Sequence, residues 1–413
     1  MMLKRLLHLL AVLSLFVFSL NPCSCAEELS ERDVDINELI IFEEEETVKE
    51  KKDSDGAYLL TITCTGDFTI GGDNRSGKKK DIFTPELEKH NGDINFIMKD
   101  VRSILMDDDL TIVNFEGTLT DTKYVPSDKK ENEFIFNITP SAVSVLPDNG
   151  VEAVSLDNNH VWDHGLEGHM DTITALTGAD VIYSTPSEPG IFDYKGLLKI
   201  AMLSFNCLDR YGDGFKKYYN GNSRHEETYD DEFLSYTSFE EAVCARIEQA
   251  KQDYPLVIVS FHWGNEPTKA NPSRGYIPTD NQIKLGRMAV DAGADLVIGN
   301  HSHRLQPVEY YNGKLICYSL GNFCFAGNNK PSDMLSMLFQ VRYRVKNNDI
   351  SYKDFRIIPI RISSTKEYNN FTPTVLTELK DGSAIDTILN VLTSKDNTKK
   401  LSYAVTDYPL EFK

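Results

Sequence analysis

The residue types most capable of chemistry in this chain are carboxylate, amide and imidazole side chains in five short polar clusters. The candidate metal ligands among them are Asp67, Glu116, Asn159, His262, His301 and His303. Mixed oxygen and nitrogen ligation without thiolate suits Mn, Fe or Zn better than Ca or Mg. A carboxylate between two such ions, with imidazoles outside it, would activate water and bind phosphate oxygens.

Each cluster alone also has a simpler interpretation. The Gly66-Asp67 and Asn158-Asn159 pairs are common at turns, and His262 could be a packed histidine. The pair His301-x-His303 is more specific, because alternate residues of a strand point to one face. The remaining histidines outside the clusters are expected at the surface or in caps, and they are His8, His90, His164, His169 and His225.

His160 is a candidate general acid. It directly follows Asn159, so it could point into a substrate pocket while Asn159 binds a metal ion. A protonated imidazole in that place could donate a proton to a leaving alkoxide.

The elements that must position these clusters are apolar runs alternating with helical patterns. The expected strands are residues 58–65, 110–113, 151–156, 197–205, 256–261, 296–298, 315–320 and 337–345. The expected helices are residues 85–106, 140–147, 165–177, 239–252, 279–292 and 384–393. This alternation predicts an α/β fold, and the carboxyl ends of its parallel strands would bring the clusters to one edge.

The organisation along the chain predicts four segments. Residues 1–26 have a basic start, an apolar stretch of residues 6–20 and small residues at Ser24 and Ala26, a pattern typical of an export signal peptide. An uncleaved membrane anchor and a lipid-modified Cys25 are the alternatives. Residues 27–56 are expected to form an acidic, flexible leader, with a short edge strand at 38–42. Residues 57–330 are expected to form the main domain. Residues 331–413 are expected to form a C-terminal extension packed on it.

Composition limits the possible partners. The chain of 413 residues carries 43 Lys and Arg against 63 Asp and Glu, a formal net charge of −20. Such acidity argues against nucleic-acid binding, which needs an excess of basic residues. The five cysteines beyond residue 26 show no CxxC spacing, and Cys64 and Cys317 are expected as buried free thiols.

Taken together and in order, the clusters resemble the bacterial CapA family of capsule and poly-γ-glutamate synthesis proteins. That family is similar to the calcineurin-like metallophosphoesterases. The matching segments are TGDFTIGG (65–72), VNFEGTLT (113–120), VSLDNNHVWDHGLEGHMDT (154–172), VSFHWGNE (259–266) and DAGADLVIGNHSHRLQPVEYYNGKLICYSLGNF (291–323).

The resemblance implies a four-layer α/β/β/α sandwich of the metallophosphoesterase type with a β-rich C-terminal extension. It carries over the six candidate ligands, and it places His160 at the proton-donor position. Asp163 and Gly165 match the D-x-G that follows. The residues expected to contact substrate are Asn114, Trp263, Glu266 and Arg304.

One departure from the phosphoesterase pattern concerns the first motif. Asp67 is followed by Phe68-Thr69 instead of x-His, so one imidazole ligand is missing. One metal ion or two, or a binding site without turnover, therefore stay open.

Two functions follow from the resemblance. The first is an exported, metal-dependent hydrolase of phosphoesters or γ-glutamyl amides that uses metal-activated water. The second is a non-catalytic polymer-binding component of a capsule synthesis machine. In both cases the expected partners are an anionic surface polymer and membrane-bound capsule synthesis proteins, at the cell surface or outside the cell.

Overall fold

The computed structural model describes residues 51–73, 81–125, 134–208, 231–347 and 349–412. The predicted signal peptide, residues 1–26, and most of the predicted leader, including the strand expected at 38–42, lie outside these residues. Within the described ranges, no helix combines the length and apolar character needed to cross a membrane.

The first of two large sheets contains the strands that carry or precede the first three polar clusters. Its order is β16-β15-β14-β1-β2-β5-β6, and β13 also pairs with β1. The strands are β1 (Tyr58–Thr69), β2 (Leu110–Phe115), β5 (Ala153–Ser155), β6 (Ile182–Ser184), β13 (Asn322–Phe325), β14 (Leu335–Lys346), β15 (Asp349–Arg361) and β16 (Thr374–Val375). The run β1-β2-β5-β6 is parallel, whereas β14 joins β1 in antiparallel orientation.

The second sheet contains the strands that precede the histidine clusters. Its order is β11-β12-β10-β9-β8-β7, with a parallel centre and antiparallel outer strands. The strands are β7 (Gly190–Tyr194), β8 (Leu198–Asn206), β9 (Leu256–His262), β10 (Leu296–Asn300), β11 (Leu305–Tyr311) and β12 (Lys314–Leu320). Every residue of β9 is buried, as expected for a central parallel strand covered on both faces. A separate short pair consists of β3 (Thr118–Leu119) and β4 (Asn137–Ile138).

Helices cover the outer faces of both sheets. The described α-helices are α2 (Thr84–Lys89), α3 (Arg102–Leu105), α4 (Gly165–Gly178), α6 (Asp231–Ser235), α7 (Phe239–Asp253), α8 (Asp280–Asp291), α9 (Glu378–Thr393) and α10 (Lys395–Thr398). Short 3₁₀ helices are η2 (Ile94–Ile97), η3 (Pro140–Val145), η4 (Pro147–Asn149) and η5 (Arg274–Tyr276). The start of α8 is fixed by a capping box between Thr279 and Gln282.

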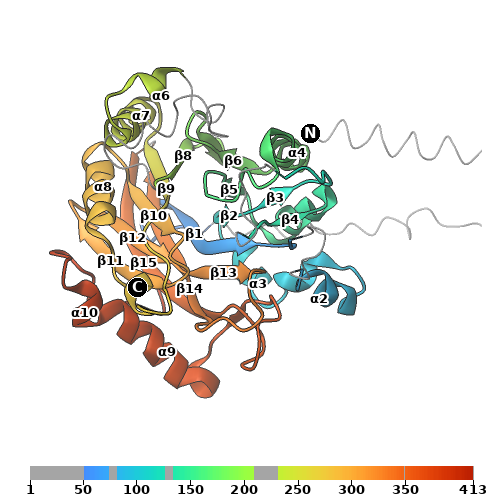
Figure 1. Cartoon of the computed structure of the whole chain (residues 1–413). Coiled ribbons are helices and arrows are strands. Elements are labelled where there is room, and N and C mark those ends of the chain that lie inside the picture. Colours follow the sequence, from blue (N-terminus) through green and yellow to red (C-terminus); the bar gives the residue numbers. More distant parts are fainter. Residues whose placement is uncertain (1–50, 74–80, 126–133, 209–230, 348, 413) are drawn as a thin grey trace, which may run out of the picture. The chain divides into compact units, whose positions relative to one another are not determined.

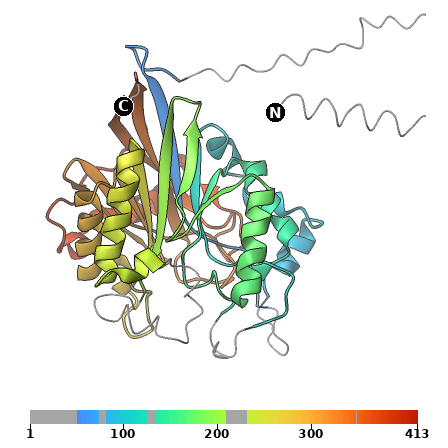
Figure 2. The ribbon, with the colours of Figure 1, turned by 90° about the horizontal axis from the view of Figure 1, so that it is seen from above.

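Three apolar layers show that the fold is a four-layer sandwich. Between the two sheets, Ile62 and Ile112 belong to one core with Ile258. On the outer face of the first sheet, the core includes Leu176 of α4, and on the outer face of the second sheet Leu285 of α8 is buried. Figure 2 shows the sheets between helices on both sides. The predicted α/β/β/α architecture is therefore confirmed.

The single helix predicted for residues 85–106 is wrong. The chain forms three short helices instead, α2, η2 and α3. A turn at Asn91 and Gly92 separates α2 from η2. Both residues have positive φ values, 55° and 79°, which a continuous right-handed helix does not allow. The helix predicted at 140–147 is a pair of 3₁₀ helices, whereas the helices predicted near 165, 239 and 279 are confirmed.

The C-terminal residues take part in the first sheet. β14 lies beside β1 near the middle of the sheet (Figure 1). β15 and β16 continue the sheet outward. Helix α9 packs Ile385, Ile388 and Leu392 into the core between the sheets. The predicted main domain, residues 57–330, therefore shares its first sheet with residues 331–413. The predicted buried thiols of Cys64 and Cys317 are confirmed.

Candidate metal centre

The carboxyl ends of strands from both sheets meet at one place, and the polar clusters lie there. Asp67 lies near the end of β1, beside Asn114 of β2 in the parallel register. Glu116 directly follows β2, and His262 is the last residue of β9. In the second sheet His262 pairs with Asn300, the residue before His301. Residues almost 240 positions apart in the sequence thus share one site.

A close approach between β1 and the residue that joins β12 to β13 positions Asp67. Its backbone N–H donates to the carbonyl of Gly321 at 2.9 Å. A Cβ atom on the preceding Gly66 would lie 2.0 Å from that same carbonyl oxygen. Only glycine permits this contact, so Gly66, which lies within β1, is required by the packing.

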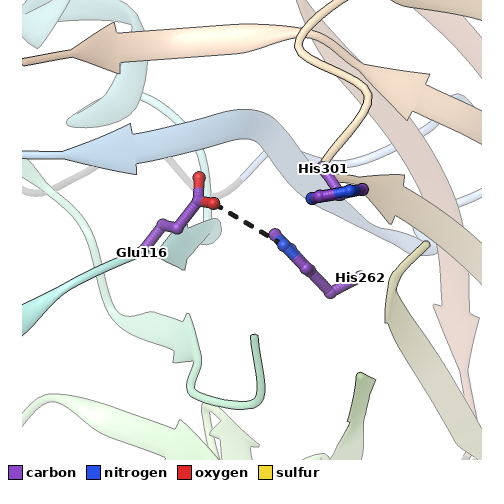
Figure 3. Close-up of side chains that lie close together, drawn as sticks. All are labelled: Glu116, His262 and His301. Atoms are coloured by element: carbon purple, nitrogen blue, oxygen red, sulfur yellow. Dashed lines mark ion pairs between the residues drawn. The ribbon is translucent and has the colours of Figure 1, made fainter. Parts of the chain in front are cut away.

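The first group of candidate ligands consists of Glu116, His262 and His301. One ligand atom from each lies within 4.8 Å of the others. Nε2 of His262 is 3.6 Å from Oε1 of Glu116, and the two imidazole rings have centres 4.7 Å apart. Figure 3 shows the three side chains, each from a different segment, pointing toward a common space. Oδ1 of Asn159 is 2.7 Å from Nε2 of His262, so it can act as a fourth ligand.

The second group shares Glu116 with the first and adds Asp67 and His303. Nδ1 of His303 lies 3.0 Å from Oδ2 of Asp67. Burial opposes a charge on this imidazole, but the bond to Asp67 and the nearby Glu116 outweigh burial and raise the pKa of His303 to about 10. The ion pair therefore occupies this group in the absence of a metal ion.

The two histidines of the last cluster converge for a different reason from the one predicted. Strand β10 ends at Asn300, so His301 and His303 are not alternate residues of a strand. Both have positive φ values, 90° and 52°, in a loop after the strand. Such backbone is uncommon for residues other than glycine and persists where the surroundings hold it. The loop turns the two rings toward the carboxylates.

The environment of Glu116 fits a bound cation. Its carboxyl group is 1 % exposed, and neither oxygen has a hydrogen-bond partner in the part of the chain that the structure describes. Burial, together with the neighbouring Asp67, raises the pKa of Glu116 well above its usual range. An unpaired buried carboxylate is unfavourable unless a positive charge compensates it. A divalent ion between the ligand groups would do so.

His301 also fits such an ion. Burial, reinforced by the nearby His303, lowers the pKa of His301 well below its ordinary value and keeps the ring neutral. Nδ1 of this ring has no hydrogen-bond partner among the described residues. A neutral imidazole with an available nitrogen is the form that binds metal ions. Carboxylate, imidazole and amide groups together match the preferences of Mn, Fe or Zn.

His160 lies at the edge of the ligand groups, with Nε2 3.9 Å from Oε1 of Glu116. Its Nδ1 is 2.8 Å from Oδ2 of Asp163, which also accepts the backbone N–H of Phe136 at 2.8 Å. Asp163 is fully buried. Gly165 follows with a φ of 64° and begins α4, so the predicted D-x-G segment forms the turn that holds this pair.

Of the four residues expected to contact substrate, Trp263 does not line the site, and that prediction is wrong. Its side chain is fully buried, stacks on Phe261 with ring centres 4.5 Å apart, and donates from Nε1 to the carbonyl of Tyr318. Gly299 leaves room for the indole there, because a Cβ atom at that position would lie 2.4 Å from Nε1 of Trp263.

The other three predicted substrate residues differ in exposure. Asn114 is 1 % exposed and contacts protein groups only in the described structure. Arg304 is 6 % exposed and donates to the carbonyl of His303 and to Oγ of Ser332. Glu266 has a half-exposed side chain, with Oε1 3.9 Å from Nε2 of His301. Glu266 is thus the one of the four that both borders the site and faces solvent.

Two histidines outside the clusters, which were expected at the surface or in caps, are buried, and one of them, His164, is the N-cap residue of α4. His169 stacks on Trp162 with ring centres 4.3 Å apart, and burial lowers its pKa to about 4. Nδ1 of His164 lies 2.7 Å from the carbonyl of Tyr124. These imidazoles fill the layer under α4 and are not part of the ligand groups.

Asn322 contacts the candidate ligands but was not predicted from the sequence as a site residue. Its Oδ1 lies 2.9 Å from Nδ1 of His303, and it pairs with Asp67 across β13 and β1. The signal was available, because Gly321-Asn322 follows an apolar strand just as the other polar clusters do.

With the geometry in place, comparison with known proteins defines the class of protein. A family model described as "Bacterial capsule synthesis protein PGA_cap" matches residues 61–327. The chain belongs to this family, and the predicted resemblance is confirmed.

Two relatives from Bacillus align over most of the chain. The chain is 29 % identical over 374 residues to "PGA biosynthesis protein CapA" of Bacillus subtilis (strain 168), covering 89 % of this chain and 85 % of the relative. It is 26 % identical over 359 residues to "Capsule biosynthesis protein CapA" of Bacillus anthracis, covering 86 % of this chain and 77 % of the relative. Among solved structures, the calcineurin-like phosphoesterase YfkN from Bacillus subtilis aligns with a TM-score of 0.40 and 13 % identity, covering 80 % of this chain and 97 % of that one.

Proposed function

We propose that this chain is an exported, metal-dependent hydrolase that acts in the biosynthesis or export of a capsule or poly-γ-glutamate polymer. The observation that carries the proposal is the buried Glu116 carboxylate, which accepts no hydrogen bond in the described structure and is shared by two ligand groups, with His160 beside it. The two Bacillus relatives are named for biosynthesis of PGA or of a capsule, and this supports the place of action.

Two positions for Mn, Fe or Zn follow from the ligand groups. Glu116, His262 and His301, with Asn159, would hold one ion, and Asp67, Glu116 and His303 would hold a second. When bound, such an ion supplies Lewis-acid chemistry, since it polarises the scissile group and makes a water molecule more acidic. The first position has four candidate protein ligands and the second has three, so the first is expected to bind more tightly.

The residues of the chain would then move the proton that hydrolysis requires. Water adds across a phosphoester or a γ-glutamyl amide: its oxygen bonds to phosphorus or to the carbonyl carbon, and the bond to the leaving oxygen or nitrogen breaks. His160 gives a proton from Nε2 to that leaving atom, and the proton that the attacking water loses passes to solvent, from which His160 is protonated again. Asp163 accepts a hydrogen bond from Nδ1 of the same ring and holds its orientation.

The charge of the chain and the charge of its substrate need to be reconciled. A protein with a net charge of −20 repels a polyanion at long range. Each bound divalent cation would contribute about two positive charges at the site and attract an anionic chain there. Glu266, half exposed beside His301, limits this attraction to the immediate neighbourhood of the ions.

Export is part of the proposal because of the N-terminal sequence. Lys4 and Arg5, the apolar residues 6–20 and the small residues before Glu27 match a signal peptide. Partners at the membrane, namely other capsule synthesis proteins, are proposed because the two Bacillus relatives are named for PGA or capsule biosynthesis. Expression of the full chain followed by N-terminal sequencing of the secreted product tests this, and a product that still begins at Met1 contradicts cleavage.

A direct experiment tests the hydrolase. The purified protein is analysed for Mn, Fe and Zn, and then incubated with a chromogenic phosphodiester and with poly-γ-glutamate of defined length. Release of chromophore or shortening of the polymer, lost in His160→Ala at unchanged metal content, supports the proposal. Polymer binding without any cleavage, with several metals supplied, would instead support the alternative of a non-catalytic polymer-binding component.

A further inference from the structure

Asn114 lies between the two ligand groups and touches one member of each. It is the second-last residue of β2, and its side chain is almost completely buried. Its Nδ2 donates to Oδ1 of Asp67 at 2.8 Å, and the same Nδ2 lies 3.3 Å from Nδ1 of His262. Asp67 belongs to the second ligand group and His262 to the first.

The orientation of this amide is fixed by backbone groups further along the network. Nδ2 of Asn158 donates to the carbonyl of Phe115 at 2.8 Å, and Oδ1 of Asn158 accepts the N–H of His160 at 3.0 Å. A carbonyl only accepts and an N–H only donates, so the amide of Asn158 has one orientation.

The same reasoning extends to Asn114. Asn158 presents Nδ2 to Asn114, whose Oδ1 accepts it at 3.2 Å. The Nδ2 of Asn114 must then face Asp67 and His262. A continuous path of hydrogen bonds therefore runs from the backbone of His160, through two buried amides, to Asp67. Because Nδ2 can only donate, it bonds to Nδ1 of His262 only while that nitrogen carries no proton.

We propose that Asn114 is a positioning residue that holds Asp67 of the second ligand group in a fixed direction and links it to the loop of His160. The proposal rests on the proposed metal centre and adds a residue that touches no ion. Groups that hydrogen-bond to metal ligands fix the direction of those ligands and typically change metal affinity when they are removed.

A neutral amide suits this place better than its alternatives. Asp67 already accepts the backbone N–H of His301 at 3.2 Å and contacts His303. A second carboxylate at position 114 would repel Asp67, and a cationic side chain would compete with a metal ion for it. Leucine has a similar shape but no donor, and it would leave Oδ1 of Asp67 with only the longer bond from the backbone N–H of His301.

The test measures Zn²⁺ affinity of the full chain by competition with a chromophoric chelator. Asn114→Leu keeps the volume and Asn114→Ala removes it, and both are expected to weaken binding by about 10- to 100-fold. Asn149→Ala is the matched control. Asn149 is equally buried and donates two side-chain hydrogen bonds, to Oδ1 of Asn95 and the carbonyl of Val145, yet it contacts no ligand. Its affinity should stay within about twofold of the wild type, as expected for an independent site.

A double-mutant cycle separates positioning from a general loss of stability. If Asn114 acts through Asp67, Asn114→Leu should cost much less affinity in an Asp67→Asn background than in the wild type. Losses that simply multiply overturn the link to Asp67. Thermal unfolding of the metal-free variants shows whether they fold, and if neither Asn114 variant folds, Asn158→Ala tests the other end of the same path.

The possible results separate the positioning role of Asn114 from the proposed metal-dependent function. Wild-type affinity in Asn114→Leu, or in Asn158→Ala if that variant is needed, overturns the positioning role and leaves the metal centre intact. A wild-type chain that takes up no Zn²⁺, Mn²⁺ or Fe²⁺ overturns both.

Discussion

His262 and Glu116 come from different sheets, yet Nε2 of His262 lies 3.6 Å from Oε1 of Glu116. This contact joins the end of β9 to the end of β2 across the sandwich. The carboxylate accepts no hydrogen bond from any described residue. A negative charge buried at this contact between the two sheets therefore requires a compensating positive charge.

Glu116→Gln should make the metal-free protein more stable and remove its response to metal. Burial raises the pKa of Glu116, so in the metal-free folded protein this carboxyl group must either stay charged without a hydrogen bond or take up a proton at neutral pH. Glutamine removes that cost, and a gain of at least about 1 kcal/mol is expected. The wild type should lose thermal stability on addition of EDTA, whereas the variant should not. Calorimetry with and without EDTA checks both statements. Glu240→Gln is the control, because Glu240 pairs with Lys284 away from the ligand groups; an EDTA effect of wild-type size in Glu116→Gln would contradict the assignment.

His301→Ala and His303→Ala should affect metal content unequally. His301 belongs to the group with four candidate ligands, and His303 to the group with three. Loss of His301 is expected to remove the tightly bound ion, while loss of His303 should remove only a weakly bound one. Elemental analysis after dialysis measures this difference. His90→Ala, which alters a ring stacked on Phe96, should keep the wild-type content, and equal content in all three variants would show that neither histidine is a ligand.

His160→Ala should keep the metal and lose turnover. Removal of a general acid typically lowers the rate by about 10²- to 10⁴-fold. Asp163→Asn should lower kcat by a smaller factor, since the ring keeps a hydrogen-bond partner but no longer a charged one. Steady-state kinetics on an active substrate, together with metal analysis of each variant, checks this. An unchanged kcat in His160→Ala would assign the leaving-group proton to another source.

Asp108 should make the protein less stable as the pH rises toward 8. Burial, opposed by a hydrogen bond from Thr111, raises the pKa of Asp108 from 3.8 to about 8, and the nearby Glu152, with a pKa of about 7, acts in the same direction. The folded state therefore keeps protons that the unfolded state releases. This contribution to stability is complete below about pH 4 and is lost progressively as the pH rises through 8.

Asp108→Asn tests this directly. The residue lines a cavity of about 340 Å³ with Thr61 and Gln340, at the end of β1 opposite to the ligand groups. Between pH 5 and pH 8, the free energy of unfolding of the variant should change less than that of the wild type. Urea denaturation at a series of pH values measures the slopes. Parallel curves for variant and wild type would mean that Asp108 is ionised in the folded protein at pH 7.

Local patterns were sufficient to predict much of the fold. The apolar run of β9 and the amphipathic helix α8 are each recognisable from their own residues. The break at Asn91-Gly92 was missed because the helical pattern continues on both sides of the turn. The place of β14 beside β1 could not be predicted, because Phe339 pairs with Cys64 over a separation that no local pattern encodes.

The candidate site shows the same division. The residue types after each strand indicated Asp67, Glu116 and the histidines, since strand ends meet at one edge. The roles of Asn114 and Asn322 depend on which atoms face each other across two strands, and this is a property of packing. Trp263 lies next to a candidate ligand in sequence, but the strand alternation directs it away from the site, so proximity along the chain was misleading.

The pairing of β14 with β1 has a practical consequence for protein production. Residues 61–327, the part that matches the family, end before β14 begins. A recombinant fragment trimmed to those limits would leave one side of β1 without its neighbour and expose a long row of unpaired backbone groups. Such a fragment would be expected to collect in inclusion bodies, whereas one extended through α9 would keep the strand that carries Asp67 enclosed.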